Sequence, residues 1–225
     1  MATSRLFPLF PIPVNLYNFG EESHELNLSL IDDIFKERKD NGGVVRSNMG
    51  GWHSKSKMEE KYQSFDLLKQ QIRLCVNRYA EEVGFESGLE VDKLWANINK
   101  NGDFNISHHH PGSACTGVYY PVNEIVNGKP KYDYQDDVSL QPSVWDGERG
   151  GSLVFHDPAC GQKVGLTARK KLEPSPYSLD NYHLYPTAGV LLIFPAYLFH
   201  TVCPFKDKRT RISISFCCDY SDGTN

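Results

Sequence analysis

The chain has 225 residues, a formal net charge of −4, 23% charged and 40% hydrophobic residues, which is the composition of a soluble globular protein. A chain of this length can bury a large core as one domain, so its stability requires no disulfide or structural metal. The mildly acidic balance excludes a diffuse attraction to nucleic acid or anionic membranes, and the sequence contains no basic patch for nucleic acid.

The N-terminus and the cysteines predict a cytoplasmic protein with reduced thiols. Residues 1–8 lack the charged-then-apolar order of a secretion signal, and no run approaches the roughly 18 apolar residues of a membrane helix. The six cysteines show no CxxC spacing. Cys217 and Cys218 are adjacent, but neighbouring strand residues face opposite sides, which opposes a disulfide between them.

Two helices are predicted within residues 1–87. The first ends at the Asp-Asn-Gly-Gly segment 40–43, and the second covers about 64–83 and ends at Gly84. Their apolar stripes are expected to pack on the same sheet. The stripe residues are Leu26, Leu28, Leu30, Ile31, Ile34 and Phe35 in the first helix, and Leu67, Leu68, Ile72, Val76 and Tyr79 in the second.

From about residue 88 to 220 the apolar pattern changes to the alternation typical of strands, which predicts about eight strands. We expect a single domain over residues 1–225, with a helical part at about 1–87 and a β core at about 88–220. The β-rich segments are 89–99, 115–120, 152–155, 190–194 and 211–216.

Two long polar stretches, at about 122–149 and 157–185, interrupt these strands. Connections this long are uncommon in a compact domain unless they cover a site, so both are candidate lids. An exposed loop is the alternative. The candidate lid residues of the first stretch are Tyr132, Tyr134, Trp145 and Arg149.

The segment that ends in His108-His109-His110-Pro111 carries the first chemical feature. On a strand, His108 and His110 point to one face and His109 to the other, so two imidazoles can bind one ion. Pro111 and Gly112 then end the strand. The alternative is a surface histidine cluster.

A histidine and an arginine further along the chain complete the pattern. His200 begins a strand after a buried apolar segment, and the upstream pair favours a ligand over a core histidine. Strict alternation in 209–216 places Arg211, Ser213 and Ser215 on one face, opposite Ile212 and its apolar neighbours. With the apolar face on the helices, Arg211 points inward, where a buried guanidinium requires an anion and suits a carboxylate. A surface arginine on an edge strand is the alternative.

This order of His-x-His, a histidine 90 residues later and an inward arginine 11 residues further on resembles the prolyl-hydroxylase-like branch of the 2-oxoglutarate and iron(II)-dependent oxygenases. The resemblance covers about residues 90–220, and the H-x-H-P element is similar to that of small phage and bacterial oxygenase-like proteins. Supporting segments are Ser47-Asn48-x-Gly50-Gly51-Trp52, Gly150-Gly151 before a central strand, Pro186…Gly189…Phe194…His200, and Tyr120.

The resemblance implies a double-stranded β-helix (jelly-roll) core, mainly β, with the two N-terminal helices packed on one sheet. It implies a dioxygenase that uses Fe(II), 2-oxoglutarate and O2, releases succinate and CO2, and hydroxylates a peptide, a protein or a small molecule. The implied iron ligands are His108, His110 and His200. The implied contacts of the oxoglutarate carboxylate are Arg211, Tyr120 and Ser213. If the chain is phage-encoded, its location is the host cytoplasm.

One position departs from the family pattern, because His110 stands where the family has Asp or Glu. Three neutral imidazoles leave one more unit of positive charge on an ion than two imidazoles and a carboxylate. Asp157 could supply the missing carboxylate, although the Asp157-Pro158 pair is more typical of a turn.

Two other functions remain open from the sequence. A cupin-type metal-binding protein also has a double-stranded β-helix, and Gly102 followed by His108-x-His110 matches the opening of its motif. The expected glutamate is replaced by Ala114, however, and Arg211 has no role there. A non-catalytic β-helix binding module is the second alternative, although three inward histidines are poor core residues without a metal or partners.

Overall fold

The computed structural model describes residues 5, 9–142, 150–159, 179–204 and 208–221. Within them the chain forms two long helices, two short 3-10 helices and fourteen strands. The helices are α1 (His24–Asp40), α2 (Gln63–Glu82), η1 (Gly20–Ser23) and η2 (Met58–Glu60). The strands are β1 (Asn15–Asn18), β2 (Asn48–Met49), β3 (Trp52–His53), β4 (Leu89–Asn99), β5 (Phe104–His108), β6 (Cys115–Tyr120), β7 (Glu124–Val126), β8 (Lys129–Lys131), β9 (Gln141–Pro142), β10 (Leu153–His156), β11 (Asn181–Leu184), β12 (Val190–Pro195), β13 (His200–Val202) and β14 (Arg209–Tyr220).

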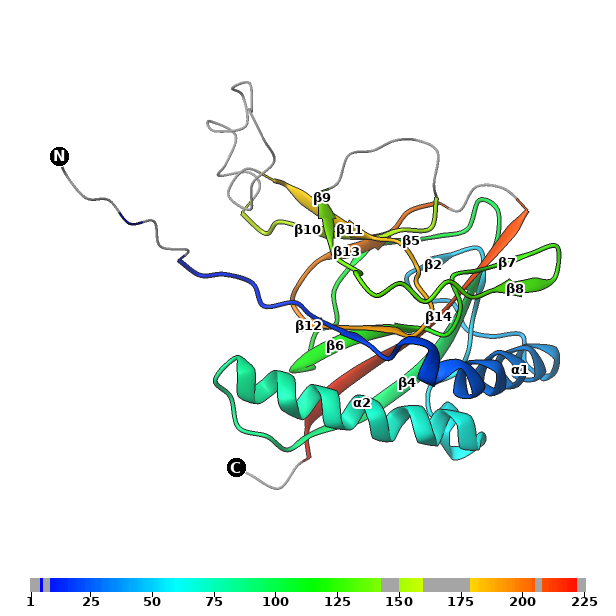
Figure 1. Ribbon diagram of the computed structural model, residues 1–225, viewed down its shortest axis with the longest axis horizontal. Helices are drawn as coiled ribbons and strands as arrows, with labels where there is room; N and C mark the ends of the chain where they lie inside the picture. Colours follow the sequence, from blue (N-terminus) through cyan, green and yellow to red (C-terminus); the bar gives the residue numbers. More distant parts are fainter. Residues whose placement is uncertain (1–4, 6–8, 143–149, 160–178, 205–207, 222–225) are drawn as a thin grey trace.

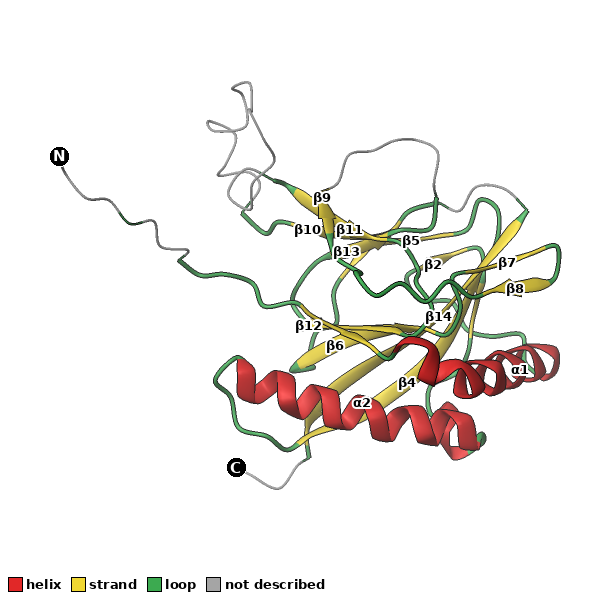
Figure 2. Ribbon diagram, in the orientation of Figure 1, coloured by secondary structure: helices red, strands yellow, loops and turns green. Residues whose placement is uncertain are grey.

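The strands form two antiparallel sheets that face each other. The first has the order β1-β12-β6-β14-β4-β3, with the β7–β8 hairpin attached to β14, and the second has the order β2-β5-β13-β10-β11-β9. Figures 1 and 2 show α1 and α2 together on the outer side of the first sheet, with the second sheet on its other side. This confirms the expected double-stranded β-helix with both helices on one sheet.

Alternation along β14 explains how the first sheet separates two environments. Ile212, Ile214 and Phe216 are fully buried in the apolar cluster that the sheet shares with α1 and α2. Arg211 and Ser213 lie on the opposite face, toward the second sheet. Cys218 belongs to the helix-side cluster and Cys217 to the inner face, and both are free thiols, as the alternation predicts.

The N-terminal part contributes strands as well as helices, which the sequence did not predict. β1 pairs with β12 in the first sheet. β2 and β3 belong to different sheets and are joined by Gly50 and Gly51, whose φ angles of 72° and 66° lie in the region that favours glycine. The Gly-Gly-Trp segment is therefore the crossing point between the two sheets.

Three residues of the predicted apolar stripes are not core residues. Leu28, Phe35 and Leu67 are 38%, 39% and 46% exposed, because they lie at the margins of stripes whose centres face the sheet. The central residues of both stripes are buried together, as predicted: Leu30, Ile31, Ile34, Leu68, Ile72, Val76 and Tyr79.

The described part of the first insertion folds against α1. Tyr132 packs edge-on to His24 at 4.8 Å between ring centroids, and the Tyr134 hydroxyl lies 3.2 Å from Nδ2 of Asn27. Asn27 in turn accepts a 2.6 Å hydrogen bond from Tyr119. Tyr132 and Tyr134 thus anchor the insertion to the helix layer, and the prediction that they form a lid is wrong. The other two candidate lid residues, Trp145 and Arg149, lie outside the described residues.

No helix in the described part of the chain combines the length and apolar character needed to span a membrane.

Candidate metal and oxoglutarate site

A cavity of about 590 Å³ opens between the two sheets. Its walls are the inner faces of β4, β14, β12 and β6 on one side and of β5, β10 and β13 on the other. His108, His110, His200, Arg211 and Ser213 all line it. The sheets therefore bring together five of the six residues that the sequence singled out.

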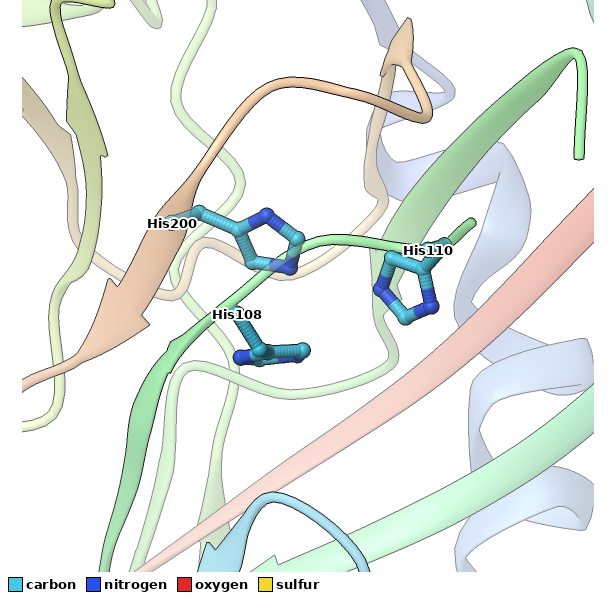
Figure 3. Close-up of side chains that lie close together, drawn as sticks. All are labelled: His108, His110 and His200. Carbon is cyan, nitrogen blue, oxygen red and sulfur yellow. The ribbon is translucent and has the colours of Figure 1, made fainter. Parts of the chain in front are cut away.

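The three histidines form one cluster through strand pairing. β13 pairs with β5 so that His200 lies opposite His108, with a register irregularity between His200 and Val202. His110 lies beyond the end of β5, where its backbone N–H donates a 2.9 Å hydrogen bond to the Ala196 carbonyl. One ring nitrogen from each histidine lies within 4.8 Å of the other two, and Figure 3 shows the rings gathered around a common space.

Backbone carbonyls hold two of the rings in a defined tautomer. Nδ1 of His108 lies 2.7 Å from the Ile106 carbonyl, and Nδ1 of His200 lies 2.9 Å from the Leu198 carbonyl. Because a carbonyl only accepts, each Nδ1 carries the proton and each Nε2 carries the lone pair. Nε2 of His108 also lies 3.3 Å from Oγ of Ser47. Neutral imidazoles with Nε2 available are the form that binds a metal ion.

His110 is oriented by a thiol. Its Nδ1 lies 3.5 Å from Sγ of Cys217, so Nε2 is the nitrogen left for an ion. Sulfur is a weak acceptor, so this ring is held less firmly than the other two. Cys217 continues the inward row of Arg211, Ser213 and Ser215, and the same alternation, extended by two residues, predicts its position.

Burial keeps all three histidines neutral. It is the main cause that lowers the pKa of His200 to about 3 and that of His110 to about 4, and the other histidines of the cluster lower both further. The pKa of His108 is also lowered, mainly by burial. At neutral pH the cluster therefore carries no proton that an ion must displace.

These shifts predict acid sensitivity of the metal-free protein. The folded-state pKa values of His110 and His200 lie below the unfolded value of 6.5, so below pH 6.5 the unfolded chain binds protons that the folded chain does not. The free energy of unfolding should then fall by up to about 1.4 kcal/mol per pH unit for each histidine, down to about pH 4. Urea unfolding at pH 7 and pH 5 measures this loss. An equal loss in a His110→Ala, His200→Ala double variant would assign it to other groups.

His109 lies outside the cluster, as predicted, but for a different reason. β5 ends at His108, so strand alternation does not orient the next residue. The His109 ring packs instead on Phe199, with 4.6 Å between centroids.

Arg211 is a buried cation that pairs with no carboxylate in the described part of the chain. It is 1% exposed, and Nε, Nη1 and Nη2 donate to the Gly151 carbonyl, the Ser213 hydroxyl and the Tyr120 hydroxyl at 2.9, 2.8 and 3.1 Å. These acceptors are neutral, and two of the five guanidinium N–H groups remain, one on each Nη. Among the described residues no carboxylate forms an ion pair with it. The cavity end at Arg211 therefore fits a carboxylate ligand.

Tyr120 and Asp157 lie outside the cavity lining. Tyr120 is fully buried behind Arg211 and contacts its guanidinium, so it is placed to position the arginine. A direct contact of Tyr120 with oxoglutarate remains a prediction.

Asp157 accepts a 2.9 Å hydrogen bond from the Ala159 N–H, which is the turn role expected of an Asp-Pro pair. His110, and not Asp157, is the third member of the cluster.

Comparison with known proteins identifies a family and a fold. A family model described as "Putative 2OG-Fe(II) oxygenase" matches residues 93–217, more than half of the chain. No curated protein matches the chain significantly.

Three solved structures illustrate the fold similarity. A Pseudomonas putida prolyl-4-hydroxylase is 14% identical, with a TM-score of 0.57 over 93% of this chain and 94% of that one. A Trichoplax adhaerens prolyl hydroxylase in complex with a hypoxia inducible factor peptide is 15% identical, with a TM-score of 0.58 over 92% and 83%. The epimerase SnoN, in complex with Fe3+, α-ketoglutarate and nogalamycin RO, is 15% identical, with a TM-score of 0.56 over 93% and 79%. At these identities the similarity shows the fold, not the substrate.

Proposed function

This chain belongs to the 2OG-Fe(II) oxygenase family, and from that premise we propose that it hydroxylates a peptide, a protein or a small molecule, with release of succinate and CO2. It is an oxidoreductase that uses Fe(II), 2-oxoglutarate and O2. The family match favours this activity over a cupin-type protein or a non-catalytic binding module. The observation that carries the proposal is the shared cavity of the three-histidine cluster and Arg211.

The residues of the cluster fit an iron(II) ion. We assign His108, His110 and His200 as its ligands, because their ring nitrogens converge within 4.8 Å and burial keeps the rings neutral. The iron supplies the activation of oxygen, which amino-acid side chains cannot perform. The protein contributes the tautomers, through the Ile106 and Leu198 carbonyls, and a cavity between the two sheets that holds the three rings together.

The Arg211 end of the cavity fits 2-oxoglutarate. The two guanidinium N–H groups left by the neutral acceptors can bind a carboxylate, and the bound carboxylate would neutralise the buried charge. Ser213 lines the cavity and accepts from Nη1, so its hydroxyl proton is free to donate to the same carboxylate. Tyr120 would act through Arg211.

The substrate class remains a proposal. Two of the compared enzymes are prolyl hydroxylases, one with a peptide bound, whereas the epimerase SnoN binds a small molecule. A peptide or protein is our first expectation.

Removal of one histidine tests the proposed function. His108→Ala should abolish stoichiometric iron binding and the conversion of 2-oxoglutarate to succinate, while the thermal unfolding profile remains cooperative because the large core does not depend on the ion. His109→Ala is the matched control and should retain both, since its ring packs on Phe199. Metal analysis and a succinate assay measure the two properties. Full iron content in His108→Ala would refute the assignment of His108 as a ligand. Loss of iron in His109→Ala would mean that His109 is the ligand instead.

The contact between Cys217 and His110 leads to a second expectation. Cys217→Ala removes the side-chain hydrogen-bond partner of His110 Nδ1, so metal affinity should fall about tenfold or more, as for other groups that orient a ligand. Cys217→Ser keeps an acceptor and should recover most of it. Cys203→Ala, which removes a buried thiol elsewhere, is the control. Competition titration with zinc measures the affinities. Equal affinities of Cys217→Ala and wild type would show that the thiol does not orient His110 for metal binding.

A further inference from the structure

The cavity lining is basic although the chain is acidic. Among the described lining residues, Arg46, Lys93 and Arg211 are basic, five are histidines and none is Asp or Glu. The whole chain has 28 acidic and 24 basic residues. A lining without a carboxylate therefore departs from the composition of the chain, and a divalent ion on neutral histidines would add to its positive charge.

Lys93 and Arg211 lie well apart along the β4–β14 pair. Across β4 and β14, Arg211 pairs with Asn99 and Cys217 pairs with Lys93. Six residues along a strand span about 20 Å. Three consecutive backbone bonds span at most about 3.6 Å. By the same geometry, the chain of four C–C bonds in 2-oxoglutarate spans only about 5 Å. An oxoglutarate held by Arg211 therefore does not extend to the strand position of Lys93, and Arg46 is the third basic residue of the described lining.

The two cations are available for a ligand. Arg46 is exposed, and within the described residues its side chain forms neither a hydrogen bond nor an ion pair. Nζ of Lys93 lies 3.2 Å from its neighbour Asp92, but these side chains are 54% and 42% exposed, and such surface pairs contribute little. Both side chains line the same cavity as the histidine cluster.

We propose that the substrate carries an oxyanion, a carboxylate or a phosphate, which Arg46 and Lys93 of the cavity lining bind while the reacting carbon faces the histidine cluster. This inference rests on the proposed function and narrows its substrate. A substrate with a lysine or arginine beside the reacting carbon would meet only like charge in the described lining, and such a pair is destabilising.

Binding of small probe ions to the full chain, loaded with zinc in place of iron and with 2-oxoglutarate, tests the proposal. Methyl phosphate and acetate are the anionic probes, and methylammonium is the cationic one. We expect saturable binding of at least one anion, followed through the NMR signals of the His53 ring, which lines the same cavity. Arg46→Gln and Lys93→Gln should each weaken it about threefold, and the double variant about tenfold. Lys55→Gln, an exposed lysine outside the lining, is the control.

Each outcome decides the proposal. Preference for acetate or for methyl phosphate identifies the oxyanion as a carboxylate or a phosphate. Absence of saturable anion binding, equal binding of methylammonium, or an affinity that the double variant leaves unchanged would each overturn it. Succinate formation by the iron-loaded wild type is measured in parallel. If succinate forms but no anion binds, only this inference fails, whereas absence of iron binding and succinate would count against the proposed function itself.

Discussion

Arg211→Ala should weaken the binding of 2-oxoglutarate by about 2–5 kcal/mol, the loss expected when one partner of a buried charge pair is removed. The side chain is 1% exposed, and three neutral acceptors hold it in one position. Its two remaining N–H groups therefore form a preorganised site for the carboxylate. Anaerobic calorimetry on the metal-loaded protein measures the affinity directly, and the KM for 2-oxoglutarate in succinate formation gives a second measure.

Two further variants separate charge, geometry and non-specific effects. Arg211→Lys keeps the charge but not the planar fork, so it should recover part of the affinity. Arg209→Ala removes a nearby arginine that instead pairs with Glu124 at 2.9 Å in β7, and it should leave the affinity unchanged. Wild-type affinity in Arg211→Ala would mean that the oxoglutarate carboxylate binds elsewhere.

Substitution of His110 tests the one proposed ligand that departs from the family pattern. His110→Ala should lose most of the bound iron, whereas His110→Asp restores the usual carboxylate and should retain the metal and some conversion of 2-oxoglutarate. Asp157→Ala is the matched control, because Asp157 accepts from the Ala159 N–H in a turn and does not line the cavity. Metal content after gel filtration measures the result. Full iron occupancy in His110→Ala would show that His110 lies near the ion but is not one of its ligands.

The burial of His110 changes what pH can reveal about this ligand. An unperturbed histidine would lose an ion as the pH falls through about 6.5, well above the value of about 4 for a carboxylate. In the cavity, burial and the neighbouring histidines lower the pKa of His110 to about 4. We therefore expect iron occupancy to persist to nearly the same pH in wild type and in His110→Asp. Only the variants, and not a pH profile, distinguish the two ligand types.

The strands were predictable from short-range patterns, whereas the histidine cluster was predictable from the order of motifs along the chain. Alternation along 211–216 and a turn before each strand are properties of consecutive residues, and they correctly predicted which side of β14 faces the helices. The grouping of His108, His110 and His200 followed from the order of motifs and the family resemblance. Arg211 followed because its face is opposite that of Ile212.

The features that escaped prediction depend on contacts between distant segments. β1 pairs with β12 across 170 or more residues, and nothing in Asn15–Asn18 identifies that partner. The position of Tyr132 depends on His24 of α1, so its aromatic character alone suggested a lid where the structure forms an anchor. The pKa of His110 depends on burial by two sheets, which no local pattern encodes.

The two faces of β14 place neighbouring codons of the gene under different selection. Ile212, Ile214 and Phe216 pack in the helix-side core, so selection on their codons acts mainly through the stability of the fold. Arg211, Ser213 and Cys217 face the cavity, so mutations there are judged by what the cavity binds. The ligand preferences of this scaffold can therefore diverge during evolution through every second codon of one strand, while the intervening codons preserve the fold.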